Sequence, residues 1–151
     1  MSELLCFILD GNFLYLDKVL VSFNDTPIFF ICVDHKHNYY VVLCHDIDNL
    51  EYIIVPQGIE NIYKMLIQVI DMRSIFLSAL CYYEVISGAT IEQDIINKKD
   101  IKDIPLEILP YANEKYEHGI TDINYIAGIK QEYRVLYNDD DSNQTVFNII
   151  S

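Results

Sequence analysis

Short apolar stretches alternate with turn-forming residues through the first third of the chain. These stretches cover residues 4–9, 13–23, 27–33, 39–44 and 50–55. Asp10-Gly11-Asn12 and Asn24-Asp25-Thr26-Pro27 separate the first three, and such residues favour tight turns. Residues 27–33 and 39–44 are apolar at both alternating positions, so we expect both faces of these strands to be covered. The pattern predicts an antiparallel meander.

The pattern changes to a helical one after Pro56. Within residues 57–70 the apolar residues are spaced three and four apart, which predicts an amphipathic helix facing the sheet. Asp71 is suited to cap a short helix over 72–79, and residues 80–86 return to a strand-like composition. The predicted fold class is therefore α+β, with a meander of four to six strands packed against one amphipathic helix and one short helix.

The last third is more polar and less regular. Residues 92–103 are charged and 104–110 predict a loop or short helix, whereas 134–137 and 145–150 are strand candidates joined by an acidic turn. With no repeat and no long linker, we expect one domain over 1–151, a length that suits a single core. Its sheet-and-helix core would span 1–91, with the acidic, tyrosine-rich extension 92–151 packed on it.

Charge changes this picture of an ordinary α+β domain. The chain of 151 residues has 23 Asp and Glu against 10 Lys and Arg, a formal charge of −13, yet 52% of its residues are hydrophobic. Disordered acidic segments are poor in apolar residues, so we expect a folded protein with a strongly negative surface. That surface disfavours nucleic acid and anionic membranes and favours basic protein partners.

Segments that would send the chain to or across a membrane are not recognisable. No apolar run reaches the 18 or more residues of a membrane span, and the N-terminus lacks the basic region of a signal peptide. The cysteines Cys6, Cys32, Cys44 and Cys81 stand singly in apolar stretches, which predicts reduced thiols. We therefore expect a cytoplasmic protein.

Tyrosines and carboxylates occur together in the last third. Tyr is common in protein interfaces, because its ring supplies apolar area and its hydroxyl a polar contact. Such residues next to carboxylates would suit docking to an Arg-rich surface. An ordinary solvated acidic face with half-buried tyrosines is the alternative. The candidate partner-binding residues are Asp139, Asp140, Asp141, Tyr137, Tyr133, Glu132, Tyr116 and Glu117.

No motif for catalysis, cofactor binding or metal binding is present in the sequence. His35 and His37 lie in a connector, and His45 stands at the far end of the next strand, roughly 23 Å away at about 3.3 Å per residue, so one metal site cannot easily use all three. Cys44 and His45 are strand neighbours and point to opposite faces. The glycines are isolated and form no phosphate-binding loop. We therefore predict a non-enzymatic protein without metal or cofactor.

Several sequence blocks resemble a known family. Residues 23–30 (FNDTPIFF), 51–56 (EYIIVP) and 70–76 (IDMRSIF) follow one another in this order. Together with 104–110 (IPLEILP) they resemble a family of small uncharacterised bacterial proteins with D-G-P-L-L-F, Y-x-x-V-P and I-D-L-R-x-x-F blocks. The resemblance covers about residues 15–115, and Thr26 departs from the usual Gly. It implies a fold and no activity.

Three functions remain compatible with the sequence. The first is a non-catalytic acidic binding module of inhibitor or immunity type, of bacterial or phage origin, that covers a basic surface of a nucleic-acid-handling protein. Such a module could mimic nucleic acid. The second is a small-molecule-binding or enzymatic module with a pocket between sheet and helix, and the third is an oligomeric accessory protein.

Overall fold

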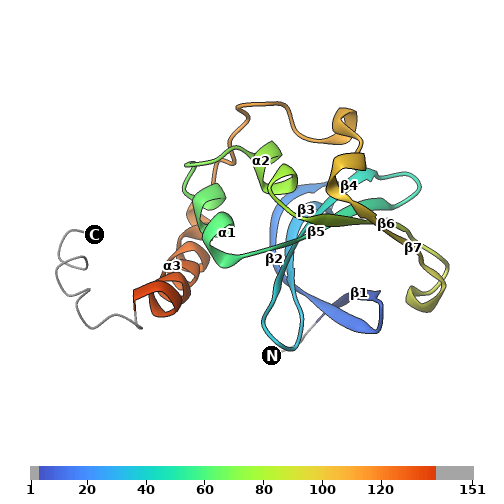
Figure 1. Ribbon diagram of the computed structural model, residues 1–151, viewed down its shortest axis with the longest axis horizontal. Helices are drawn as coiled ribbons and strands as arrows, with labels where there is room; N and C mark the ends of the chain where they lie inside the picture. The colour runs from blue at the N-terminus through green and yellow to red at the C-terminus, as the bar shows by residue number, and fades with distance from the viewer. Residues whose placement is uncertain (1–3, 139–151) are drawn as a thin grey trace.

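Seven antiparallel strands, arranged in the order of the sequence, form the sheet of this protein (Figure 1). The computed structural model describes residues 4–138. The strands are β1 (Leu5–Leu9), β2 (Asn12–Phe23), β3 (Thr26–Val33), β4 (Tyr39–Asp46), β5 (Glu51–Gln57), β6 (Cys81–Ile86) and β7 (Ile95–Asp100). The predicted α+β class and the meander are confirmed, but four to six strands were too few.

The first two hairpins follow from local backbone chemistry. Asp10 and Gly11 both have positive φ, 52° and 80°, and Leu9 pairs with Asn12 across them. Asn24 and Asp25 repeat the arrangement with φ of 49° and 65°. Two-residue turns of this kind match the twist of antiparallel strands, and Gly, Asn and Asp tolerate the left-handed conformation. Both predicted turns are present.

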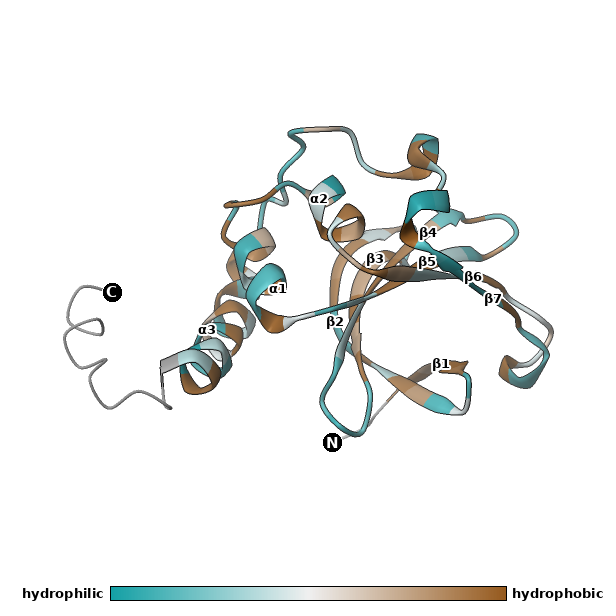
Figure 2. Ribbon diagram, in the orientation of Figure 1, coloured by the Kyte–Doolittle hydropathy of each residue, from teal (hydrophilic) through white to brown (hydrophobic). Residues whose placement is uncertain are grey.

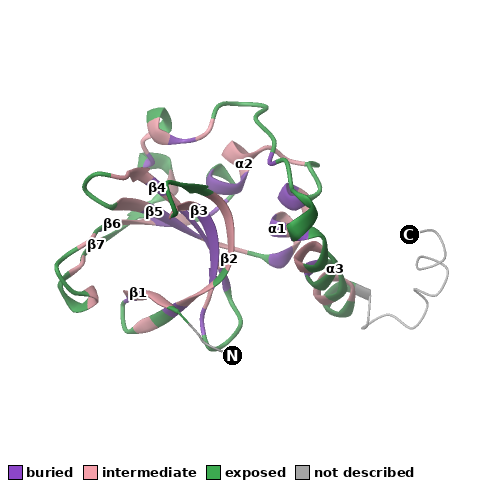
Figure 3. Ribbon diagram, turned by 180° about the vertical axis from the view of Figure 1, so that it is seen from behind, coloured by how far each residue is buried: buried purple, intermediate pink, exposed green. Residues whose placement is uncertain are grey.

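The curl of the sheet gives it two apolar cores. Along β3, Phe29 and Ile31 enter the core beneath the helices, whereas Phe30 and Cys32 enter a second core on the opposite face. The second core also contains Phe7 from β1, because the sheet bends until its first strand lies beneath the middle ones (Figure 1). Register shifts in the β2–β3 pairing accompany this bend. The sequence predicted that both faces of the strands at 27–33 and 39–44 are covered. This is confirmed, because β3 and β4 have buried residues on both faces (Figures 2 and 3).

Helices α1 (Ile59–Leu66) and α2 (Met72–Leu77) lie on one face of the sheet. The buried side of α1 carries apolar residues at helical spacing, including Ile62 and Leu66. Asp71 caps α2, because its carboxylate accepts a hydrogen bond of 2.8 Å from the Ser74 amide. Both helices are those predicted, with narrower bounds.

The C-terminal portion differs from its prediction. Residues 134–137, a predicted strand, belong to helix α3 (Ile123–Asn138). This segment is helical because one side of α3 packs into the core that α1 also covers. That side carries apolar residues at helical spacing, namely Ile126, Ile129 and Tyr133. The second predicted strand, 145–150, and the acidic turn 139–141 lie outside the described residues.

Short one-turn helices connect the remaining elements. They are η1 (Ile91–Gln93), η2 (Ile101–Asp103), η3 (Leu106–Ile108) and η4 (Ile120–Asp122). Ile104 and Leu109, on either side of η3, are buried in the helix-covered core and hold η3 against the sheet. Within residues 4–138, no helix is long and apolar enough to cross a membrane.

Candidate functional site

Glu132, one of the predicted partner-binding residues, binds two side chains of the protein itself. The Tyr39 hydroxyl donates hydrogen bonds to both Glu132 carboxylate oxygens, at 2.6 and 2.9 Å, and His37 Nε2 lies 2.7 Å from Oε1. Tyr39 is buried, and this burial, together with the neighbouring carboxylate, raises the pKa of Tyr39 so that its hydroxyl stays a donor. Glu132 therefore ties α3 to the start of β4.

Tyr116 also has an internal role. Its ring is buried, and its hydroxyl donates a 2.6 Å hydrogen bond to Asp122, which in turn pairs with Lys18 at 3.1 Å. Burial opposes ionisation of Asp122, but bonds from Tyr116, the Gly119 amide and Lys18 outweigh it and lower the pKa of this carboxyl. Tyr116 thus belongs to the core, and its contact with a partner stays a prediction.

The other predicted residues are divided between surface and interior. Tyr133 is half-buried and stacks on Tyr63 of α1, with ring centroids 5.6 Å apart. The ring of Tyr137 lies next to that of Tyr133, with ring centroids 4.9 Å apart, and Tyr137 remains 54% exposed. Glu117 is also exposed. The structure thus leaves Tyr137 and Glu117 accessible. Asp139, Asp140 and Asp141 lie outside the described residues, so their contact with a partner stays a prediction.

An acidic recess that the sequence did not reveal lies at the other end of the sheet. It measures about 280 Å³, and its charged walls are Glu51 at the start of β5, Glu84 in β6 and Glu107 in η3. His45, near the end of β4, completes the polar lining. Its apolar lining is formed by Tyr52, Ile53, Val85, Ile86, Pro105 and Ile108.

The sheet pleat explains how these carboxylates meet. Glu51 shares a face with the buried Ile53, and Glu84 shares a face with the buried Tyr82, because side chains two apart on a strand point the same way. Both acids therefore point to the face that the helices and η3 cover, and η3 adds Glu107 from above. A carboxylate at an inward position of a strand is the sequence signal that could have indicated the recess.

Charge in the recess is incompletely balanced. Lys99 pairs with Glu84 at 3.0 Å. Neither Glu51 nor Glu107 forms an ion pair with any residue in the described part of the chain. The three carboxylates outnumber Lys99 and give the recess an excess of negative charge. Such a site attracts cationic groups.

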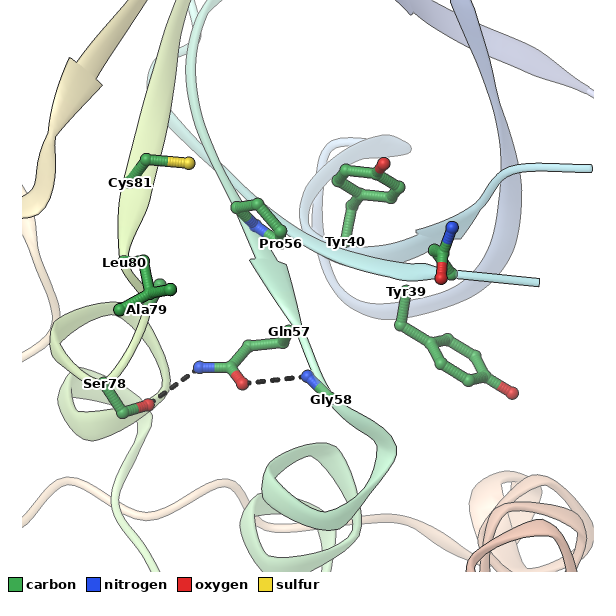
Figure 4. Close-up of a pocket in the computed structure, with 10 residues that line it drawn as sticks. Tyr39, Tyr40, Pro56, Gln57, Gly58, Ser78, Ala79, Leu80 and Cys81 are labelled. Atoms are coloured by element: carbon green, nitrogen blue, oxygen red, sulfur yellow. Dashed lines mark hydrogen bonds between the residues drawn. The ribbon is translucent and has the colours of Figure 1, made fainter. Parts of the chain in front are cut away.

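A larger groove of about 420 Å³ lies at the opposite ends of β4, β5 and β6 (Figure 4). It opens because the pairing between β5 and β6 stops at Ile54 and Tyr83, which leaves Pro56 and Cys81 on opposite sides of a gap. The polar side chain at its floor is Gln57. This amide is already engaged by Ser78 at 2.7 Å and by the Gly58 amide at 3.0 Å. The groove is mainly apolar and offers little polar chemistry.

Asp34 and Asp122 are the two buried carboxylates in the described part of the chain, each 6% exposed. Asp34 organises the connector between β3 and β4. Its oxygens accept bonds from the amides of Lys36 and Asn38, both at 2.9 Å, and from the Asn12 side chain at 3.0 Å. All of these donors belong to the protein itself, so Asp34 has a structural role.

Nucleophile and metal chemistry gain no geometric support. Among residues 4–138, no three His, Cys, Asp or Glu side chains converge as a metal site would require. The four cysteines are free thiols, as predicted. Cys44 is buried and its burial raises the pKa of its thiol, whereas His45 lines the recess.

Comparisons with family models, curated proteins and solved structures found no significant match for this chain. The family resemblance therefore rests on its sequence blocks alone.

Proposed function

We propose that this protein is a non-catalytic acidic binding module of inhibitor or immunity type, of bacterial or phage origin. Its partner is a nucleic-acid-handling protein, whose basic surface the module covers. The observation that carries the proposal is the surplus of carboxylates on a well-packed domain. The chain has a formal charge of −13, and the part that the structure describes contains three ion pairs between a lysine and a carboxylate.

The negative charge of this protein favours a basic protein as partner over nucleic acid or an anionic membrane. A surplus of exposed negative charge steers cationic surfaces toward the protein and repels phosphate backbones. A module of this kind competes with DNA or RNA for the same basic surface. Neither a catalytic group nor a bound cofactor is needed for such an activity.

Capture from bacterial lysate tests this function. The tagged protein is used after nuclease treatment, at about 0.05 M and about 0.5 M salt, because exposed charge pairs are strongly screened over this range. We expect partners that bind at low salt, are lost at high salt and are nucleic-acid-binding proteins. Each purified partner is then tested for displacement of its DNA or RNA by the module. Capture that is indifferent to salt, or partners that keep their nucleic acid, would contradict the proposal.

Small-molecule binding is the second candidate, and the groove of Figure 4 is the observation that favours it. The groove lies at the ends of the strands, whereas the interface between sheet and helices is closely packed around Ile53, Ile62 and Phe76, all fully buried. Ligand-observed NMR with a small apolar fragment set, repeated on Leu80→Asp, tests this. Leu80 is 90% exposed at the groove, so this change should remove binding without unfolding the protein.

A further inference from the structure

Exposed apolar side chains border the acidic recess. Ile86 in its wall is 41% exposed and pairs across the strands with Ile95 of β7, which is 57% exposed. Leu106 of η3, next to Glu107, is 52% exposed, and Leu50, next to Glu51, is 39% exposed. The Leu50 carbonyl accepts a 3.1 Å bond from the Ser87 amide, which places Leu50 beside Ile86. Together, Leu50, Ile86, Ile95 and Leu106 form the rim.

Neighbouring apolar residues left exposed around a concave site are typical of interaction surfaces. The rim residues come from four separate segments that converge only in the folded protein. Ile86 lines a recess of about 280 Å³ whose walls hold Glu51, Glu84 and Glu107, and the other three rim residues adjoin residues of its lining. The surface therefore combines an acidic centre with an apolar border.

We propose that this surface docks a cationic, amphipathic protein segment, with one Arg or Lys side chain in the recess and apolar side chains on the rim. The inference rests on the proposed function and assigns its contact face. Charge complementarity selects the occupant, because Glu51 and Glu107 form no ion pair within residues 4–138. An arginine can form paired hydrogen bonds with a carboxylate, which adds geometric fit to charge.

The neighbouring cations do not cancel this charge. Lys99 is occupied by Glu84. Lys98 alternates with Lys99 along β7 and lies 5.7 Å from the ring centroid of Tyr83, a residue that packs on the core of the opposite face. A cationic side chain entering the recess therefore meets Glu51 and Glu107 first.

The test uses a fluorescent peptide that alternates arginine and leucine, titrated into the full-length protein at low salt. Control peptides replace arginine by glutamate or leucine by serine. We expect the Arg–Leu peptide to bind and both controls to bind at least about tenfold more weakly, because the first loses the charge contacts and the second the apolar ones. Amide shifts in NMR spectra should gather at His45, Glu51, Ile86 and Glu107.

Matched variants locate the site. Glu51→Gln with Glu107→Gln should reduce affinity about tenfold or more, and Ile95→Ser with Leu106→Ser should reduce it by a similar factor. The charge-matched control is Asp10→Asn with Asp25→Asn, two exposed residues outside the recess. Both have positive φ, which Asn tolerates. This control should retain full affinity.

The outcomes separate this inference from the proposed function. Loss of binding in the Asp10/Asp25 variant, or on neutralisation of Asp139, Asp140 and Asp141, with retention in the Glu51/Glu107 variant, would overturn the recess as the contact face and leave the acidic module intact. Failure of every cationic peptide to bind would also overturn the docking site. The lysate capture and displacement assay, which needs no peptide, would then decide whether the function itself fails.

Discussion

At the scale of single residues, buried polar groups account for much of the specificity of this fold. Burial opposes ionisation of Asp34, but hydrogen bonds from Asn12, Asn38 and Lys36 outweigh it and lower the pKa of this carboxyl to about 2. In the described chain, no fully buried side-chain nitrogen or oxygen lacks a hydrogen-bond partner. A buried acceptor with several donors is costly to alter, because each donor would lose its partner away from water.

Asp34→Asn should lower the free energy of unfolding by about 2 kcal/mol, because an amide nitrogen would replace an oxygen that accepts hydrogen bonds. Asp46→Asn is the matched control. Asp46 accepts bonds from the Asn49 amide and side chain in an exposed loop, where water can substitute. Urea unfolding followed by fluorescence measures both. Equal losses in the two variants would contradict the structural role of Asp34.

The same carboxyl predicts a pH dependence. Its pKa of about 2 in the folded protein lies below the ordinary value of 3.8 for an aspartate, so ionised Asp34 stabilises the fold fully above about pH 4. This contribution is lost as pH falls toward about 2. The stability difference between the wild type and Asp34→Asn should therefore be constant at neutral pH and narrow below about pH 4. A difference that grew on acidification would contradict this.

At the scale of elements, α3 is fixed by a seam of tyrosine–carboxylate bonds along its sheet-facing side. Tyr39 donates to Glu132, and Tyr125 donates a 2.6 Å bond to Asp17 of β2. Between them Ile129 is buried in the core. Glu132, which the sequence suggested for a partner, thus helps to hold this helix in place.

Tyr39→Phe should loosen α3 while leaving the sheet intact. Loss of the bonds to Glu132 should cost about 1 kcal/mol, which raises amide hydrogen exchange in α3 about fivefold where opening of the helix limits exchange. Exchange in β3 to β5 should not change. Tyr111→Phe is the control, since Tyr111 is 80% exposed. Unchanged exchange in α3 would show that apolar packing alone holds the helix.

Pairing between strands explains one element that the sequence did not indicate. β7 has the sequence Ile-Ile-Asn-Lys-Lys-Asp and is mostly exposed, so it lacks the apolar alternation of a strand (Figure 2). It is a strand because its whole length pairs with β6. Lysines on such an edge also discourage pairing with other chains.

At the scale of the whole molecule, the excess of carboxylates sets how it behaves in solution. A formal charge of −13 at pH 7 gives self-repulsion between copies, and the sequence pI is about 4.4. The exposed apolar rim and the exposed end of α3, with Val135 and Leu136, would favour association once this repulsion is removed.

Light scattering should therefore detect single molecules at pH 7 and low salt, and association as the pH approaches about 4.4, where the net charge vanishes. Raising the salt at pH 7 should have a weaker effect in the same direction. Stable dimers or larger species at pH 7 in low salt would instead favour the third function, an oligomeric accessory protein.

The sequence alone determined the features that depend on neighbouring residues. Asp10-Gly11 and Asn24-Asp25 specify their turns because few residues tolerate positive φ, and Asp71 specifies the start of α2 because its side chain reaches an amide three residues on. Apolar stretches bounded by turn-forming residues specified the first five strands. The sign of the surface charge also follows from composition.

Only the tertiary structure decided features that depend on distant segments. β7 is defined by its partner strand, and α3 by the core that its apolar side enters. The recess joins Glu51, Glu84 and Glu107 from three elements, β5, β6 and η3. Tyr116 is buried, and its hydroxyl is bonded to Asp122. Local backbone preferences cannot encode such meetings, because they arise from packing between segments far apart in the chain.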